Sequence, residues 1–173
     1  MLRLLLLRHA KSAWNDATQT DHQRPLNDRG VDAAPKMGSY ISSREIEPEV
    51  VLISSATRAQ QTAELVISQF SEKPQIQIMD ELYNFSSYLS VLNIIRNKGE
   101  KHSPLMIIAH NPTMEELAFE LTGTGNNAAR ALMNEKYPTA ALAVLDFDIN
   151  KWADLQTGIG TLISFTRPRD LAE

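Results

Sequence analysis

Three short apolar segments without internal polar residues constrain the fold of this chain more than any other feature. They are LLLL at 4–7, VVLI at 50–53 and LMIIA at 105–109. Such uninterrupted segments are typical of strands buried on both faces, as in a parallel sheet covered by helices. A weaker segment, IQIM, lies at 76–79. We therefore expect these four segments to be strands of one mostly parallel sheet.

Segments with helical spacing follow three of these strands. Their apolar residues recur mostly at intervals of three and four, at positions 59, 63, 66, 67 and 70, at 88, 89, 92 and 95, and at 114, 117, 118 and 121. Near the end of the chain, 141–148 and 159–165 resemble strands without a clear helix between them, which predicts an antiparallel pair at or near one edge. The pattern predicts one domain over 1–173, with three α/β/α layers, a mostly parallel central sheet and an antiparallel strand near the C-terminus.

Another segment combines a helical pattern with a proline. Apolar residues at 31, 34, 37 and 41 predict a helix over 27–43 that is capped by Asn27. Pro35 lies inside this segment and removes a backbone donor. We therefore expect a kink near 31–35 or a helix that begins late.

Composition excludes several classes of protein. The chain has no cysteine, which rules out disulfides, thiolate metal sites and cysteine nucleophiles. Its net charge of -4 and the lack of a basic run argue against a nucleic-acid partner. The N-terminal apolar run is too short for a signal peptide, and no segment reaches the roughly 18 apolar residues of a membrane span. We expect a cytoplasmic protein that binds no membrane.

Polar residues follow the predicted strands where each one ends. Arg8 and His9 follow the first strand, and His110 follows LMIIA. Arg58 stands in the first turn of the helix after VVLI, where the helix dipole favours an anion over a cation. Ligands bind beyond the carboxyl ends of parallel strands, so these four residues predict a pocket for a phosphate group.

Such a pocket is suited to phosphoryl transfer. A neutral imidazole is a nucleophile toward phosphorus, and neighbouring arginines lower its pKa and keep it neutral. The same arginines stabilise the charge on the transferred group, so we expect neither a cofactor nor a metal. The four histidines also lack the spacing and accompanying carboxylates that a metal site needs.

Several stretches together resemble the histidine phosphatase superfamily, whose fold is called phosphoglycerate mutase-like. They are LRLLLLRHAKSAWN, DHQRPLNDRG, VVLISSATRAQQTAE, DELYNF, LMIIAHNPTMEELA and YPTAALAVLDFD, and they span residues 2–148. The similarity is greatest to phosphohistidine phosphatases of the SixA type. Ala10 replaces the glycine that more often follows the histidine in the superfamily, a change that is familiar in the RHAKS subgroup.

The resemblance implies roles for individual residues. It implies that His9 is the phosphorylated nucleophile, and that Arg8, Arg58 and His110 hold the phosphoryl group. Arg24 corresponds to a further arginine of this subgroup. Asn15 stands where relatives contact phosphate, although its loop could place it elsewhere.

The general acid is the least determined part of the predicted site. Many members of the superfamily use an acidic residue after the third strand, which makes Glu81 the first candidate and Asp80 the second. Either could instead be a solvated carboxylate at a strand end. An acid matters most for a poor leaving group, whereas imidazole leaving from phosphohistidine can already carry a proton.

The substrate also has alternatives. The short chain lacks the long insertions that cover the pocket in mutases, so we expect a phosphohistidine-bearing protein as the partner. A small phosphate ester is the alternative, and a catalytically weak phospho-binding module is another. LDFD at 145–148 resembles the motif of aspartate-nucleophile phosphatases, but we interpret it as the end of a hairpin strand. Four aromatic residues either line the pocket or pack elsewhere: Trp14, Tyr83, Phe85 and Trp152.

Overall fold

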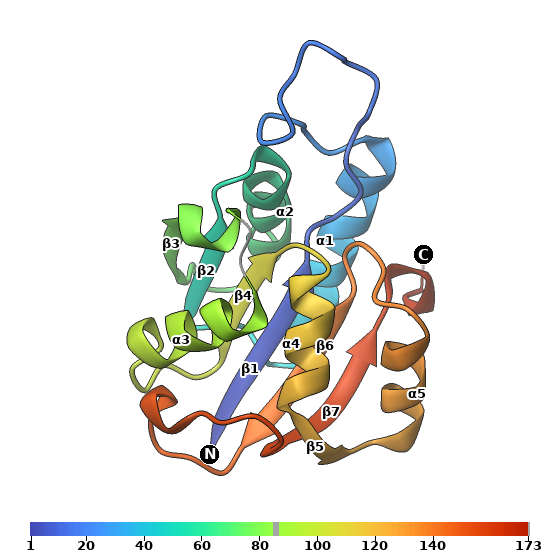
Figure 1. The fold of residues 1–173 in the computed structure, drawn as a ribbon. Helices are drawn as coiled ribbons and strands as arrows, with labels where there is room; N and C mark the ends of the chain where they lie inside the picture. Colours follow the sequence, from blue (N-terminus) through green and yellow to red (C-terminus); the bar gives the residue numbers. More distant parts are fainter. Residues whose placement is uncertain (85–86, 173) are drawn as a thin grey trace.

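One mixed sheet forms the centre of the protein (Figure 1). A computed structural model describes residues 1–84 and 87–172, and in this part of the chain seven strands pair in the order β3-β2-β4-β1-β6-β7-β5. Their bounds are β1 Leu2–Arg8, β2 Val50–Ser54, β3 Gln75–Met79, β4 Leu105–Ala109, β5 Thr122–Gly125, β6 Leu142–Phe147 and β7 Gly160–Thr166.

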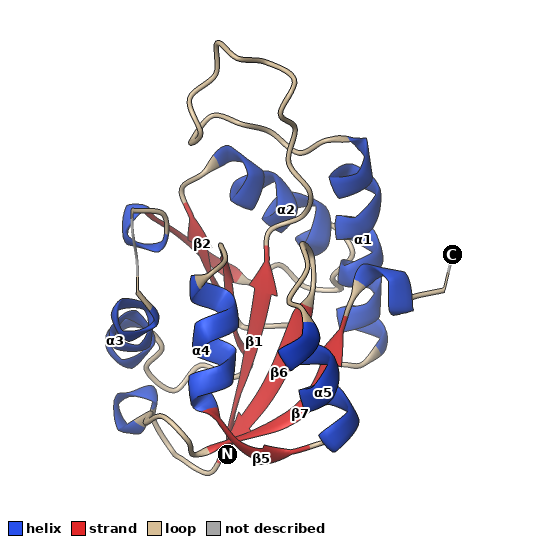
Figure 2. Cartoon of the chain, turned by 45° about the vertical axis from the view of Figure 1, so that its right-hand side comes forward, coloured by secondary structure: helices blue, strands red, loops and turns tan. Residues whose placement is uncertain are grey.

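Helices cover both faces of this sheet, which gives the predicted three layers (Figure 2). Helices α1 and α2 pack on one face, and α3, α4 and α5 pack on the other. Their bounds are α1 Asp28–Ser43, α2 Thr57–Ile67, α3 Tyr88–Lys98, α4 Thr113–Leu121 and α5 Asn127–Glu135, with single 3₁₀ turns at Asp80–Leu82, Trp152–Asp154 and Pro168–Asp170.

The leucine run in β1 confirms the reasoning from apolar segments. Leu4 and Leu6 pack among the residues of α3, α4 and α5, whereas Leu5 and Leu7 pack against α1 and α2. All four side chains are fully buried. Because successive side chains of a strand point to opposite faces, a strand covered on both faces needs apolar residues at every position.

The pairing at the C-terminal end confirms the predicted antiparallel pair near one edge. β6 runs antiparallel to both β1 and β7, so the expected antiparallel strand near the C-terminus is present. β7 is one strand in from the edge, because β5 pairs with it in parallel at the outside. Neither β5 nor α5 was predicted from the sequence. The β5 sequence, TGTG, is too short and too rich in glycine to indicate a strand.

Helix α1 begins at Asp28, so a late start is wrong. The Asn27 side chain accepts a hydrogen bond of 3.0 Å from the Gly30 N–H, as expected of a cap. The helix then continues without interruption through Pro35. A Cβ added to Gly30 would collide with the Lys11 carbonyl oxygen, so glycine lets the helix approach the loop that leaves β1.

Two further expectations concern helices. The predicted apolar face of α3 included Leu89, but this side chain is 53% exposed, and Val91 is buried beside Leu92 and Ile95 instead. The prediction is therefore confirmed for Leu92 and Ile95 and wrong for Leu89. Among the described residues, no helix is both long and apolar enough to cross a membrane.

Candidate active site

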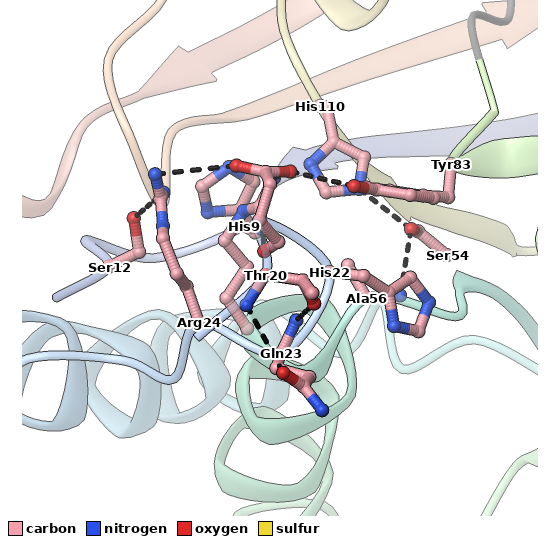
Figure 3. Close-up of polar contacts among 12 residues, drawn as sticks. His9, Ser12, Thr20, His22, Gln23, Arg24, Ser54, Ala56, Tyr83 and His110 are labelled. Atoms are coloured by element: carbon pink, nitrogen blue, oxygen red, sulfur yellow. Dashed lines mark hydrogen bonds and ion pairs between the residues drawn. The ribbon is translucent and has the colours of Figure 1, made fainter. Parts of the chain in front are cut away.

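The ends of three neighbouring strands bring the predicted residues together. Arg8 is the last residue of β1 and pairs in register with Ala109, the last residue of β4. The His9 N–H then donates to the Ala109 carbonyl at 3.0 Å, which places His110 beside His9. The two imidazole centroids are 5.0 Å apart. The prediction that His9 and His110 meet at one edge of the sheet is therefore consistent with the strand register (Figure 3).

His9 is held as a neutral ring with one free nitrogen lone pair. Its Nδ1 lies 2.7 Å from the Ala10 carbonyl oxygen, and since a carbonyl only accepts, Nδ1 carries the proton. Nε2 is then the unprotonated nitrogen. Burial, His110 and the nearby guanidinium groups of Arg58 and Arg8 lower the His9 pKa to about 3. The ring therefore stays neutral at pH 7.

A hydroxyl and a backbone amide orient these two histidines. Thr62 Oγ1 accepts the Ala10 N–H at 3.0 Å, which holds the backbone of the residue whose carbonyl binds His9. Ser54 Oγ lies 2.6 Å from His110 Nε2 and accepts the Ala56 N–H at 3.3 Å. With the Ser54 hydroxyl donating to Nε2, the His110 proton lies on Nδ1. That nitrogen is buried without a hydrogen-bond partner in the described chain, and burial followed by Arg58 lowers the His110 pKa to about 4.

Three arginines surround the histidines and retain unused donors. The Arg8 Nη1 donates to the Tyr137 carbonyl at 2.9 Å, and the Arg24 Nη2 donates to Ser12 Oγ at 2.6 Å. Within residues 1–84 and 87–172, the Nε atoms of Arg8, Arg24 and Arg58 are buried without hydrogen-bond partners. Buried donors without acceptors are costly, and an anion with several oxygens would satisfy them together.

Asp21, which was not predicted from the sequence, belongs to the site together with Tyr83, which the sequence left open between the pocket and packing elsewhere. Arg58 donates to the Asp21 carbonyl at 2.7 Å and to its Oδ2 at 3.1 Å, and Tyr83 donates to Oδ2 at 2.8 Å. Arg24 Nη1 lies 3.4 Å from Oδ1, an ion-pair contact without hydrogen-bond geometry. Partial burial acts to raise the Asp21 pKa, but the bonds from Tyr83 and Arg58 lower it overall. Asp21 opens the DHQRPLNDRG stretch, and that motif was the available signal.

A cavity of about 600 Å³ opens beside these groups. Its walls come from the loop that carries Asp21, from the first turns of α2 and α4, and from the turn after β3. The residues that line it are Asp21, Arg58, Leu82, Tyr83, Asn84, His110, Asn111, Pro112, Thr113 and Glu116. The Asp21 loop connects β1 to α1 and projects beyond the end of the sheet (Figures 1 and 2).

Two predicted residues lie apart from this arrangement. Glu81 and Asn15 are exposed, and neither forms a hydrogen bond or ion pair with the described residues of the site. Asp80 is also exposed. Arg24, in contrast, is 8% exposed, and its ion-pair contact with Asp21 places it beside the site. The structure therefore brings Arg24 to the site and leaves Glu81 and Asn15 at the surface.

The aromatic residues have separate positions. Tyr83 lines the cavity, with its ring centroid 5.7 Å from that of His110. Trp14 is exposed and stacks on the Arg24 guanidinium at 3.3 Å from the ring centroid. Trp152 is fully buried in the core, and Phe85 lies outside the described residues. Asp146 of LDFD binds Arg3 at 2.6 Å near the opposite end of β1, which fits a structural role.

Comparisons with known proteins agree with the geometry. The sequence model of the histidine phosphatase superfamily (branch 1) matches residues 4–87. An uncharacterized protein of Mycobacterium tuberculosis is 34% identical over 165 residues, which are 94% of this chain and 100% of that protein. The phosphohistidine phosphatase SixA of Escherichia coli is 29% identical over 126 residues, 69% of this chain and 74% of its own.

Solved structures give the same result. The crystal structure of a candidate phosphohistidine phosphatase SixA from Agrobacterium tumefaciens superposes with a TM-score of 0.81 at 31% identity, covering 96% of this chain and 98% of that one. The fold is therefore the phosphoglycerate mutase-like fold that the sequence predicted. From its sequence match and its three-layer structure, this chain belongs to the histidine phosphatase superfamily.

Proposed function

We propose that this chain is a metal-independent phosphatase that forms a covalent phosphohistidine on His9 and that its substrate is phosphohistidine on a protein. Membership of the superfamily supports the phosphatase activity. One observation carries the assignment of His9: its Nδ1 proton is committed to the Ala10 carbonyl, so the Nε2 lone pair is available in a neutral ring beside guanidinium groups.

The reaction proceeds in two steps. The Nε2 lone pair of His9 attacks phosphorus while the bond from phosphorus to the substrate nitrogen breaks, and the substrate imidazole leaves with a proton. A water molecule then attacks the phosphorus of phospho-His9, the Nε2–phosphorus bond breaks, and inorganic phosphate leaves. Arg8, Arg24 and Arg58 donate to the phosphoryl oxygens with the buried Nε atoms that lack other partners. His110 donates from Nδ1.

The carboxylates near the site favour a substrate with a good leaving group. Glu81 is exposed, so its assignment as general acid receives no support from its position. Asp21 lies in the cavity wall, but the bonds from Tyr83 and Arg58 keep its pKa low and its carboxylate ionised at neutral pH. An ionised carboxylate cannot give a proton to an alkoxide. A protonated imidazole needs none, which supports phosphohistidine over alkyl phosphates.

The shape of the site supports a protein substrate. The cavity of about 600 Å³ adjoins the exposed surface formed by Asn84 and Pro112, without a second domain above it in the described chain. A phosphorylated side chain on a protein surface has to reach the nucleophile from outside. A site whose wall is exposed allows this approach.

The test compares three substrates in the presence of a chelator: a phosphohistidine protein, an aryl phosphate and an alkyl phosphate. Wild type should hydrolyse phosphohistidine with the highest kcat/KM, and His9→Ala should be inactive on all three. His102→Ala is the matched control, because His102 lies beside Glu49 and not at the site. Full activity of His9→Ala, or loss of wild-type activity in chelator, contradicts the mechanism. A higher kcat/KM for the alkyl ester contradicts the substrate.

A further inference from the structure

A second cleft, distinct from the phosphate pocket, lies between α1, the segment after α5 and the C-terminal segment. Its volume is about 490 Å³. We call it the basic cleft, because six of the side chains that line it are cationic: Lys11, Arg29, Lys36, Lys136, Arg167 and Arg169.

The positive charge of this cleft is only partly neutralised. Asp32 binds Lys36 at 2.9 Å, and Asp170 binds Arg167 at 2.7 Å. Glu135 also lines the cleft. The other four cations form no ion pair within 4.0 Å among residues 1–84 and 87–172; they are Lys11, Arg29, Lys136 and Arg169. Since the whole chain has a net charge of -4, this face has the opposite sign to the rest of the molecule.

One side of the basic cleft is formed by the segment that carries the nucleophile. Lys11 is two residues from His9, a separation of at most about 7 Å along the backbone. The opposite wall contains Pro138 and Thr139. They belong to the segment in which the Tyr137 carbonyl accepts from Arg8 and the Ala140 N–H donates to the carbonyls of Arg8 and His9. Two segments that form the cleft therefore also hold the backbone of Arg8 and His9.

The two anion sites differ in construction. In the phosphate pocket, buried guanidinium groups with unused donors converge, which suits one compact anion. In the basic cleft, the cations come from four separate segments, and Lys11, Arg29, Lys136 and Arg169 are exposed. Cations spread around a cavity of about 490 Å³ fit several anionic groups held apart on one chain.

We propose that the basic cleft binds a carboxylate-rich segment of the phosphoprotein substrate, next to its phosphorylated residue. This proposal rests on the proposed function and adds how the partner is selected. A chain with net charge -4 repels acidic proteins except where cations gather, in the phosphate pocket and at this cleft, so the cleft attracts the partner beside the pocket and orients it toward His9. Each exposed ion pair between the cleft and an acidic segment changes the affinity by less than about fivefold, and several together change it roughly tenfold.

The experiment uses two synthetic phosphohistidine peptides of equal length. In one, five glutamates flank the phosphohistidine; in the other, serines replace them. The test variant is Arg29→Glu/Lys136→Glu/Arg169→Glu. The control, Lys73→Glu/Lys98→Glu/Lys101→Glu, makes the same change in net charge with exposed lysines that do not line the cleft. Turnover of an aryl phosphate by each variant checks that it is folded.

We expect wild type to hydrolyse the acidic peptide with roughly tenfold higher kcat/KM than the serine peptide at low salt, and the preference to fall as salt screens the charges. The test variant should lose this preference and keep its aryl phosphatase activity, while the control keeps both. Equal kcat/KM for the two peptides in wild type, or an equal loss in both variants, overturns the proposal.

A binding measurement separates this proposal from the proposed function. The unphosphorylated glutamate peptide should inhibit aryl phosphate turnover of wild type and the control, with an inhibition constant roughly tenfold higher for the test variant. If neither phosphopeptide is hydrolysed but this difference appears, the substrate assignment fails and the acidic docking site stands. If phosphohistidine is hydrolysed but the three inhibition constants agree, the docking site fails and the function stands.

Discussion

The buried neutral state of His9 predicts how acid changes the stability of the protein. His9 is 7% exposed and its pKa is about 3, whereas a histidine in the unfolded chain has a pKa of about 6.5. Between these values the unfolded state binds a proton that the native state does not, so stability falls as pH falls. The contribution of His9 is present above pH 6.5 and is lost progressively down to about pH 3.

The magnitude follows from the interval of pH. The pKa of His9 in the unfolded chain lies about two units above pH 4.5, and each unit corresponds to about 1.36 kcal/mol. Acidification from pH 7 should therefore lower the free energy of unfolding by about 2.7 kcal/mol through His9. His9→Gln cannot bind this proton. The free energy of unfolding of the variant should therefore fall about 2.7 kcal/mol less than that of wild type, although both lose the contributions of their carboxylates.

Urea unfolding at pH 7.0 and pH 4.5, followed by the fluorescence of buried Trp152, measures this difference. The comparison uses the change with pH within each protein, because the substitution also alters stability at neutral pH. Imidazole nitrogen shifts in NMR spectra give a second readout, with the His9 proton on Nδ1 at pH 5. Equal pH responses of the two proteins, or a His9 titration near pH 6.5, would refute the reasoning.

Three further substitutions test the geometry of the site. Arg58→Ala removes a buried, charge-assisted donor worth roughly 1.5–3 kcal/mol, so kcat/KM should fall at least about tenfold, and near-normal kinetics would show that Arg58 does not contact phosphate. Glu81→Gln should change kcat/KM less than about threefold on phosphohistidine and on an alkyl phosphate, because this exposed carboxylate lies away from the cavity; a larger loss on the alkyl ester would restore it as the acid. Gly30→Ala forces the start of α1 away from the Lys11 carbonyl and should cost about 1–3 kcal/mol in urea unfolding, while an unchanged midpoint would contradict the close approach.

Local patterns in the sequence were sufficient to predict most strands of the sheet and the residues at the centre of the site. Burial on both faces requires apolar residues at Leu4–Leu7 of β1 and at every position of β4, so these strands are visible as runs. Parallel strands end at the same edge, which is why His9 and His110 could be placed together without coordinates. The Asn27 cap was equally local, because its bond to Gly30 spans three residues.

The tertiary structure decided the features that depend on the path of the chain between these patterns. The Tyr83 hydroxyl reaches Asp21 across 62 positions of sequence, and neither residue stands in a periodic segment that would reveal the contact. The strand β5 pairs with β7 where the backbone of Gly123 lies close against the Gly158 carbonyl, an approach that a Cβ at position 123 would block. The exposure of Glu81 also could not be predicted from the sequence, because a carboxylate after a strand can turn toward the pocket or toward water. The direction depends on the 3₁₀ turn at Asp80–Leu82, which buries Leu82 and leaves Glu81 at the surface.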